Sequence, residues 1–223
     1  MRRKRTSGAS IIEFTLAMLV LVPLLLGTTA IGLNMVLDLQ VVQLARDAGH
    51  MYAKGMDFSQ TGNLTILTDL GSGVGMSSTA GQGNAVVVLS SVLYVDKGVC
   101  SGFGLVDGNG NPAGCTNYQK WVFTQRLTIG NSTIHTSNLG SPVTTGGSAV
   151  TLDATTGKVN PASQEATNSG DVAVFNGLNP FVVAGNLDQL PSGQVLYVAE
   201  AAAKGFVMPP YATGAIMYSY TMF

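Results

Sequence analysis

The residues best placed to do chemistry lie at the start of the chain. Four basic residues at positions 2–5 lead to a junction of small residues, Gly8 and Ala9, and then to a single carboxylate, Glu13. The run that follows, positions 14–37, carries no charge. A carboxylate at the edge of a membrane span is costly and usually has a functional partner. We therefore expect Glu13 to act in assembly and the basic cluster to set membrane topology.

The remaining residue types do not form an arrangement typical of an enzyme. The two histidines, His50 and His135, have no recognisable partner arrangement for general-base work. The serines never occur in a Gly-x-Ser-x-Gly motif, and no strong motif pairs two carboxylates. We therefore expect no catalytic residue, no cofactor and no enzyme. His50 is interpreted as a solvated or capping residue and His135 as a surface residue.

One metal-binding motif is partly present. Asp107, Asn109 and Asn111 occupy the first three ligand positions of a calcium-binding loop. Pro112 stands where that loop needs glycine, and no acid supplies the distal bidentate ligand. The segment is better explained as a Gly/Asn turn, and no metal site is expected.

Cys100 and Cys115 are the two cysteines of the chain. In a chain that leaves the cytoplasm, two neighbouring cysteines predict one disulfide. Neither histidine lies at a metal-ligand spacing from this pair, so a metal site is disfavoured. Closing a loop of this length is expected to stabilise the folded state by about 3 kcal/mol in the chain-entropy treatment.

The apolar run behind Glu13 predicts a membrane-spanning helix. Residues 14–33 are 20 uncharged and mostly apolar positions, which suffice to cross a hydrocarbon core of about 30 Å. Pro23 removes one helix hydrogen bond and is expected to kink the span, which membrane helices tolerate. Gly27 and Gly32 would either admit a neighbouring helix closely or only make the helix flexible.

Three interpretations of this span remain open from the residues alone. It is a signal-anchor helix, a secretory signal peptide cut after the small residues at positions 28–30, or a helix cut in front of the apolar run that keeps its span. The apolar run continues beyond positions 28–30, which disfavours the second interpretation.

The helix is expected to continue past the membrane as an amphipathic half. Apolar residues recur there at steps of three and four: Leu33, Leu37, Val41, Leu44, Ala48 and Met51. Gly55 is a natural helix stop. From Ala9 to Lys54 the helix would be roughly 70 Å long.

The chain changes character after this helix. Residues 57–84 are rich in Gly, Ser, Thr and Asn and predict a linker. Residues 130–193 are similarly polar and should hold short strands or a small helix. Four segments rich in β-branched and apolar residues predict strands: 85–95, bulged at Ser90-Ser91, 121–129, 194–203 and 215–223.

The order of these elements predicts an α+β fold. No helical pattern separates the strands, so the sheet should be antiparallel and should pack on the apolar stripe of the long helix. The expected divisions are a basic leader at 1–8, a long transmembrane and amphipathic helix at 9–56, the Gly/Ser-rich linker at 57–84, and an extracytoplasmic β-rich domain with long Gly/Ser/Thr-rich loops at 85–223.

Composition supports a membrane-anchored or extracytoplasmic chain. Charged residues make up 10% of the sequence, against roughly 25% in typical soluble domains. Beyond Gly8 the chain keeps 7 basic and 12 acidic residues, a net charge of −5. Such a chain lacks the clustered cations that a nucleic-acid partner requires.

The N-terminal constellation resembles the class III signal of type IV pilin-like proteins, in which a short basic leader ends in Gly and precedes four residues, Glu and an apolar helix. Gly8 matches the last leader residue, Glu13 the fifth mature position and Phe14 the sixth. Within that class the sequence is similar to the TadE-like family of tight-adherence pilus systems, on residues 22–27 and 43–49 as well. The resemblance covers about the first 55 residues.

The resemblance implies that a prepilin peptidase cuts between Gly8 and Ala9 and that the chain is a minor pilin or pseudopilin. The new amine at Ala9 would pair with Glu13 of a neighbouring subunit, which neutralises a charge that is costly in a low-dielectric helix bundle. The implied partners are the peptidase, other pilin or pseudopilin subunits along the N-terminal helix, and the membrane. The implied location is the bacterial cytoplasmic membrane, crossed once with the N-terminus in the cytoplasm, or an extracellular pilus after processing.

Two other functions are weighed against this one. In the first, the helix only tethers a β domain that binds a ligand outside the cytoplasm. In the second, which is disfavoured because no catalytic motif is present, the tethered domain is a hydrolase. Sequence alone leaves open what the β domain contacts and where in a filament the chain would sit.

Overall fold

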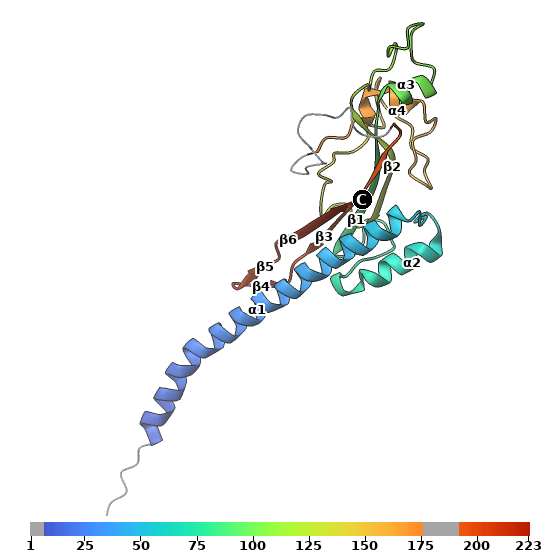
Figure 1. The fold of residues 1–223 in the computed structure, drawn as a ribbon. Coiled ribbons are helices and arrows are strands. Elements are labelled where there is room, and N and C mark those ends of the chain that lie inside the picture. The colour runs from blue at the N-terminus through green and yellow to red at the C-terminus, as the bar shows by residue number, and fades with distance from the viewer. Residues whose placement is uncertain (1–6, 176–191) are drawn as a thin grey trace, which may run out of the picture.

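The computed structural model of the chain describes residues 7–175 and 192–223. Residues 1–6, which belong to the predicted leader at 1–8, and residues 176–191 lie outside the described residues. The chain forms one long helix and a β-sheet. The C-terminal half of the helix lies against the sheet, and the N-terminal half projects away from it (Figure 1). This arrangement confirms the predicted α+β fold.

Helix α1 spans Ser7–Ala53 without interruption and contains Pro23. At its C-terminus Gly55 adopts a left-handed φ of 83°. The Gly55 N–H donates to the carbonyl of Tyr52, and the Met56 N–H donates to the carbonyl of Met51. This pair of bonds is a Schellman cap, which needs a residue without a Cβ and ends the helix at the glycine expected from the sequence.

The sheet has four antiparallel strands in the order β2-β1-β3-β6. Their bounds are β1 Ala85–Tyr94, β2 Trp121–Gly130, β3 Val195–Lys204 and β6 Ile216–Met222. All four predicted strands are therefore confirmed. The register between β1 and β2 shifts between Ser91 and Val92, at the bulge expected from the two serines.

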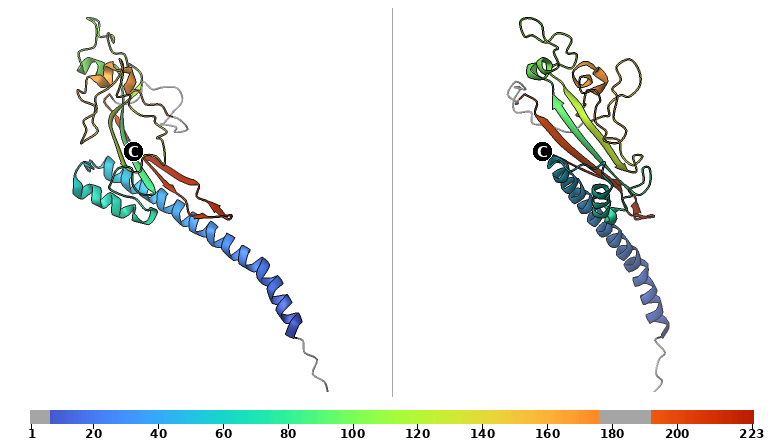
Figure 2. Two further views of the ribbon diagram at one scale, coloured as in Figure 1. Left: turned by 180° about the vertical axis from the view of Figure 1, so that it is seen from behind. Right: turned by 90° about the vertical axis from the view of Figure 1, so that its right-hand side faces the viewer.

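The amphipathic half of α1 covers one face of the sheet, as Figure 2 shows from two directions. Its predicted stripe enters the main core through Val41, Leu44 and Ala48, which are buried against alternate residues of β1 and β3. Leu37 and Met51 are partly buried beside them. Successive side chains of a strand point to opposite faces of the sheet, so the residues of β1 and β3 that lie between the buried ones point to the face turned away from α1.

The prediction of a linker at residues 57–84 was wrong for residues 61–74. They form helix α2, Thr61–Leu70, and the short 3₁₀ helix η1, Ser72–Val74, rather than a linker. Leu67 and Val74 are buried in the same core as the α1 stripe. This segment contains apolar residues at helical spacing among its many polar residues. Their burial beside α1 stabilises a helix that the composition of the segment alone does not favour.

Long loops cover the second face of the sheet, through Ile134 and Leu139, and the end of the sheet beyond the C-terminus of α1 (Figure 1). They hold helix α3, Lys97–Gly102, helix α4, Gln164–Thr167, and the 3₁₀ helix η2, Ser169–Asp171. The small helix expected within 130–193 is thereby confirmed. Asp96 caps α3, since its Oδ1 accepts from the Val99 N–H at 2.8 Å.

The predicted disulfide between Cys100 and Cys115 is present and ties α3 to the loop that follows it. Within that loop the Asp107 carboxylate accepts from the backbone N–H groups of Asn109 and Asn111 at 2.9 and 2.8 Å. These bonds lower the pKa of Asp107. The segment is a turn, and in the part of the chain described no cluster of three or more His, Cys, Asp or Glu side chains could hold a metal ion.

A separate two-stranded hairpin extends the sheet edge along α1. It consists of β4, Val207–Met208, and β5, Ala212–Thr213. It lies between β3 and β6 in sequence and reaches down beside the middle of α1 (Figure 1).

Candidate functional site

The N-terminal half of α1 carries the residues singled out from the sequence. Gly8, Ala9, Glu13 and Phe14 all lie in the first turns of one continuous helix. Ala9 and Glu13 are four residues apart, so their Cα atoms lie one turn apart on the same face, about 6 Å along the axis. Both Glu13 and Phe14 are exposed.

The helix surface behind Glu13 is apolar and bare. Large apolar side chains from Ile11 to Leu26 are exposed, several by more than 60%. The richest 18-residue stretch has a mean hydropathy of 2.3, and only 6% of it is buried. The helix is therefore long and apolar enough to cross a membrane.

The two glycines of the span have different surroundings. A Cβ added to Gly32 would meet nothing within 4 Å, whereas one added to Gly27 would stand 3.5 Å from the Tyr211 ring. The side of the helix marked by Gly32 is thus open to a neighbouring helix. The side marked by Gly27 is approached by the β4–β5 hairpin of the same chain.

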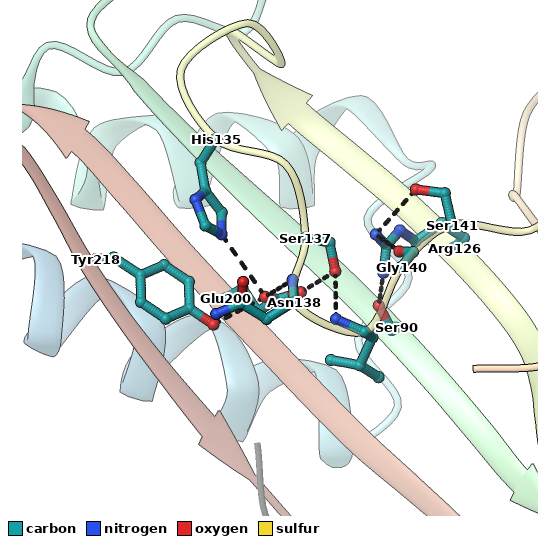
Figure 3. A network of polar contacts seen from close by, with 10 residues as sticks. Ser90, Arg126, His135, Ser137, Asn138, Gly140, Ser141, Glu200 and Tyr218 are labelled. Atoms are coloured by element: carbon teal, nitrogen blue, oxygen red, sulfur yellow. Dashed lines mark hydrogen bonds and ion pairs between the residues drawn. The ribbon is translucent and has the colours of Figure 1, made fainter. Parts of the chain in front are cut away.

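A buried polar cluster lies at the centre of the sheet, on the face turned away from α1 (Figure 3). At its centre is Glu200 of β3, which is 1% exposed. Its carboxylate accepts from the hydroxyl of Ser137, from the Asn138 N–H at 2.8 Å and from the hydroxyl of Tyr218 at 2.8 Å. Burial, and then the neighbouring Glu200 carboxylate, raise the pKa of Tyr218.

Arg126 of β2 supplies the opposite charge in this cluster. Its guanidinium donates to the hydroxyl of Ser90 and, at 2.6 Å, to the carbonyl of Gly140. Burial lowers the pKa of Arg126 to about 10, and the charge of Glu200 opposes that shift. Together Arg126 and Glu200 hold the loop of residues 131–141 on the sheet.

The cluster contains a serine, a histidine and a carboxylate, but not in the order of a nucleophilic triad. A triad places histidine between the serine and the acid. Here Ser137 donates directly to Glu200, and the Nε2 of His135 lies 3.9 Å from Glu200 without a hydrogen-bond partner among the described residues. His135 has no hydrogen bond to activate Ser137, so the geometry supports a structural role for the cluster.

The prediction that His135 is a surface residue was wrong. Its side chain is 17% exposed and its ring packs, tilted, against that of Tyr218, with 4.4 Å between ring centroids. His50, in contrast, is exposed in the last turn of α1 as expected, and its ring lies 4.3 Å from that of Phe223.

The position of Glu200 at the centre of a polar cluster was not predicted. The available signal was a single acid within the otherwise uncharged strand segment 194–203. Ser137 and Asn138 lie about 60 residues earlier, in a loop without a motif, and Tyr218 lies on the neighbouring strand β6. Only the folded loop brings them together.

A second group of buried acids lies beside an open cavity of about 470 Å³. Glu165 lines the cavity together with Gln125, Lys158 and Tyr197. Burial raises the pKa of Glu165 to about 7 and, with help from Glu165, that of Asp171 to about 8. Neither carboxylate oxygen of Asp171 has a hydrogen-bond partner within the described ranges.

Comparison with known proteins adds one finding. Residues 8–50 match the family model described as TadE-like protein. The match covers the bare half of α1 and nearly all of its packed half, and it ends before the sheet begins. No curated protein and no solved structure matches the chain.

Proposed function

Because residues 8–50 are TadE-like, we propose that this chain is a minor pilin or pseudopilin that contributes to a tight-adherence-type pilus or secretion filament. In this proposal a prepilin peptidase removes the leader between Gly8 and Ala9. The chain itself performs no catalytic step. Its partners are the peptidase and other pilin-like subunits, which it contacts through the N-terminal half of α1.

The observation that carries the proposal is the bare apolar surface of α1 between Ile11 and Leu26, with Glu13 near its start. A surface of this size is not stable in water and requires lipid or other apolar helices. Lipid covers it in a membrane anchor, and neighbouring helices cover it in a filament. The same surface therefore serves both states.

Glu13 distinguishes the filament from a simple anchor. A lone carboxylate among apolar helices needs a cation, and the amine created at Ala9 would be one. Because Ala9 and Glu13 share a helix face one turn apart, two parallel helices displaced by about one turn would bring the amine of one chain to the carboxylate of the next. That contact would set the axial spacing of subunits.

The packed half of α1 would transmit this spacing to the sheet domain. It is buried against β1 and β3 through Val41, Leu44 and Ala48, so the helix and the sheet move together. The domain outside the membrane would then be displayed at fixed intervals along the filament.

The first test is the N-terminus of the mature protein. The full chain is produced in cells with and without a prepilin peptidase, purified from membranes and sequenced from its N-terminus. The proposal predicts a start at Ala9 only when the peptidase is present. A start at Met1 in both samples, or at Ile31, contradicts it.

The second test separates assembly from tethering. Glu13→Leu and Glu13→Gln are compared with Thr15→Leu, a control that alters an exposed residue two positions away. The proposal predicts that both Glu13 variants remain in the membrane but disappear from sheared filaments, while the control assembles. If all three variants assemble equally, Glu13 has no role in assembly.

The cavity beside Glu165 favours one alternative, in which the sheet domain binds a ligand and α1 only tethers it. That function needs neither cleavage nor Glu13. It therefore predicts unchanged behaviour of Glu13→Leu, and the experiment above decides between the two.

A further inference from the structure

We propose that the hairpin of residues 205–215, which includes β4 and β5, inserts into the outer part of the lipid bilayer beside α1 and acts as a second membrane contact. This proposal rests on α1 crossing the membrane, but not on cleavage or filament assembly. It assigns the hairpin a lipid partner that the N-terminal family match does not cover.

The hairpin lies against α1 between Gly27 and Asn34. The Phe206 N–H donates to the Asn34 Oδ1 at 2.8 Å. Ala30 is fully buried, and the ring of Tyr211 lies 3.5 Å from the position of a Cβ on Gly27. The three helix residues follow one another at steps of three and four, so the hairpin tracks one face of α1 toward its N-terminus. Figure 2 shows this hairpin beside α1 in both views.

The depth of this contact follows from the length of the span. A helix needs about 20 residues to cross the hydrocarbon core, which from Phe14 places the outer boundary near Leu33. Gly27 lies six residues before Leu33, or about 9 Å along the axis. Even if the span begins at Ile11, its outer boundary falls near Ala30 and Gly27 remains inside the core. Tyr211 touches α1 at a level that the membrane occupies.

The surface of the hairpin suits lipid. Residues 205–223 carry no charged side chain. Val207 is 60% exposed, and Tyr211, 37% exposed, offers an aromatic ring with a polar tip of the kind enriched at membrane interfaces. The nearest charge, the exposed Lys204, lies at the base of the hairpin, where its long side chain can reach the headgroups.

The backbone of the hairpin is also compatible with lipid. An N–H group without a hydrogen-bond partner is costly there, and the hairpin satisfies or lacks the N–H groups near its tip. Its tip is Pro209-Pro210, and neither residue has an N–H to satisfy. The Tyr211 N–H donates to the Met208 carbonyl at 2.7 Å, and the Gly205 N–H donates to the Ala215 carbonyl at 2.9 Å. Between them β4 and β5 pair with each other.

Lipid is the occupant that this geometry favours over a second copy of the chain. The tip of the hairpin reaches Gly27 through Tyr211, within the bare half of α1, so whatever solvates that half of the helix also meets the tip. Before assembly, that solvent is the acyl-chain region of the bilayer.

The test uses fluorescence quenching of the full chain in vesicles of phosphatidylcholine and phosphatidylglycerol. The described residues contain no free cysteine, and both cysteines of the chain are paired, so one added cysteine gives a unique labelling site. An environment-sensitive fluorophore is placed on Pro210→Cys, at the tip of the hairpin beside Tyr211. Leu19→Cys serves as the lipid control in the span, and Val143→Cys as the aqueous control in a distant loop; all three side chains are exposed.

The proposal predicts that lipids carrying a nitroxide high on the acyl chain quench the label at position 210, as deeper nitroxides do at position 19. Iodide in the buffer should quench position 210 at least about threefold less than position 143, as expected for a group buried several ångströms below the headgroups.

Three results would overturn it. Equal iodide quenching at 210 and 143 places the tip of the hairpin in water. If the label is protected from iodide but is not quenched by nitroxide lipid, and this protection is lost when the protein is diluted with more lipid, a second copy of the chain covers the hairpin. Absence of lipid quenching at position 19 as well removes the membrane span itself, and with it both this inference and the proposed function.

Discussion

Gly49 of α1 lies directly against Thr221 of β6. A Cβ built on Gly49 would stand 2.5 Å from the Thr221 Cγ2 and 2.7 Å from a ring atom of Phe223, with the Cβ of Ala199 at 3.2 Å. Any side chain at position 49 would therefore displace the helix from the sheet. This single close approach sets how α1 docks on the domain that it carries.

Gly49→Ala should accordingly destabilise the folded domain. Overpacking of this kind costs about 1–3 kcal/mol, reduced by up to about 1 kcal/mol because alanine is the better helix former. Chemical denaturation of the full chain in detergent measures the change. The matched control is Gly62→Ala in α2, where an added Cβ meets nothing within 4 Å and stability should stay equal or rise.

Tyr218→Phe should weaken the buried cluster around Glu200. The substitution keeps the ring but removes a hydroxyl that donates to the carboxylate at 2.8 Å, a bond to a charged group worth about 1.5–3 kcal/mol. Tyr220→Phe, two residues along the same strand at a more exposed site, should change the unfolding free energy by no more than about 0.5 kcal/mol. Equal effects of the two substitutions would show that the Glu200 bond contributes nothing.

The stability of the domain should fall as the pH rises from about 4 to about 8. Glu165 and Asp171 have folded pKa values raised to about 7 and about 8, above the 4.5 and 3.8 of the unfolded chain. The folded state therefore binds more protons, and each acid loses its favourable contribution as the pH climbs through this window. Asp171→Asn should flatten the profile of melting temperature against pH.

Asp153→Asn provides the control for that profile, with the opposite sign. The Asp153 carboxylate accepts from the N–H groups of Thr155 and Thr156, and these bonds lower its pKa. A lowered pKa stabilises the folded state above the pKa of the unfolded chain. Removing this carboxylate should therefore reduce stability at neutral pH and leave the decline between pH 4 and 8 in place.

Replacing both Cys100 and Cys115 by serine should destabilise the sheet domain by about 3 kcal/mol and leave processing intact. The disulfide lies in a cluster beside α3, at the end of the molecule opposite to the N-terminus of α1 (Figure 1). Denaturation measures the first effect and N-terminal sequencing the second. Loss of cleavage at Gly8 in this variant would contradict the separation of the two roles.

Local patterns were sufficient for most of the secondary structure. The run behind Glu13 is apolar without a charge, so a helix is the form in which it satisfies its own backbone, and Gly55 ends that helix through its left-handed φ. Segments of β-branched residues form strands because such side chains fit the pleated backbone of a sheet. The bulge between Ser91 and Val92 also lies where the two adjacent serines predicted it. The polar composition of residues 57–84 predicted a linker, but the spacing of Leu67 and its apolar neighbours is helical, and their burial against α1 makes the segment a helix.

The sequence by itself thus determined the apolar helix with one acid near its start, the four strands and the disulfide, because each depends on residues close together in the chain. The tertiary structure alone decided that Glu200, Ser137 and Tyr218 form one buried cluster and that a charge-free hairpin lies along α1 beside Gly27. Such contacts join residues that are far apart in sequence, and no local periodicity records them. The cluster depends on the loop of residues 131–141 folding over the sheet face turned away from α1, and the hairpin depends on its contacts with Gly27 and Asn34.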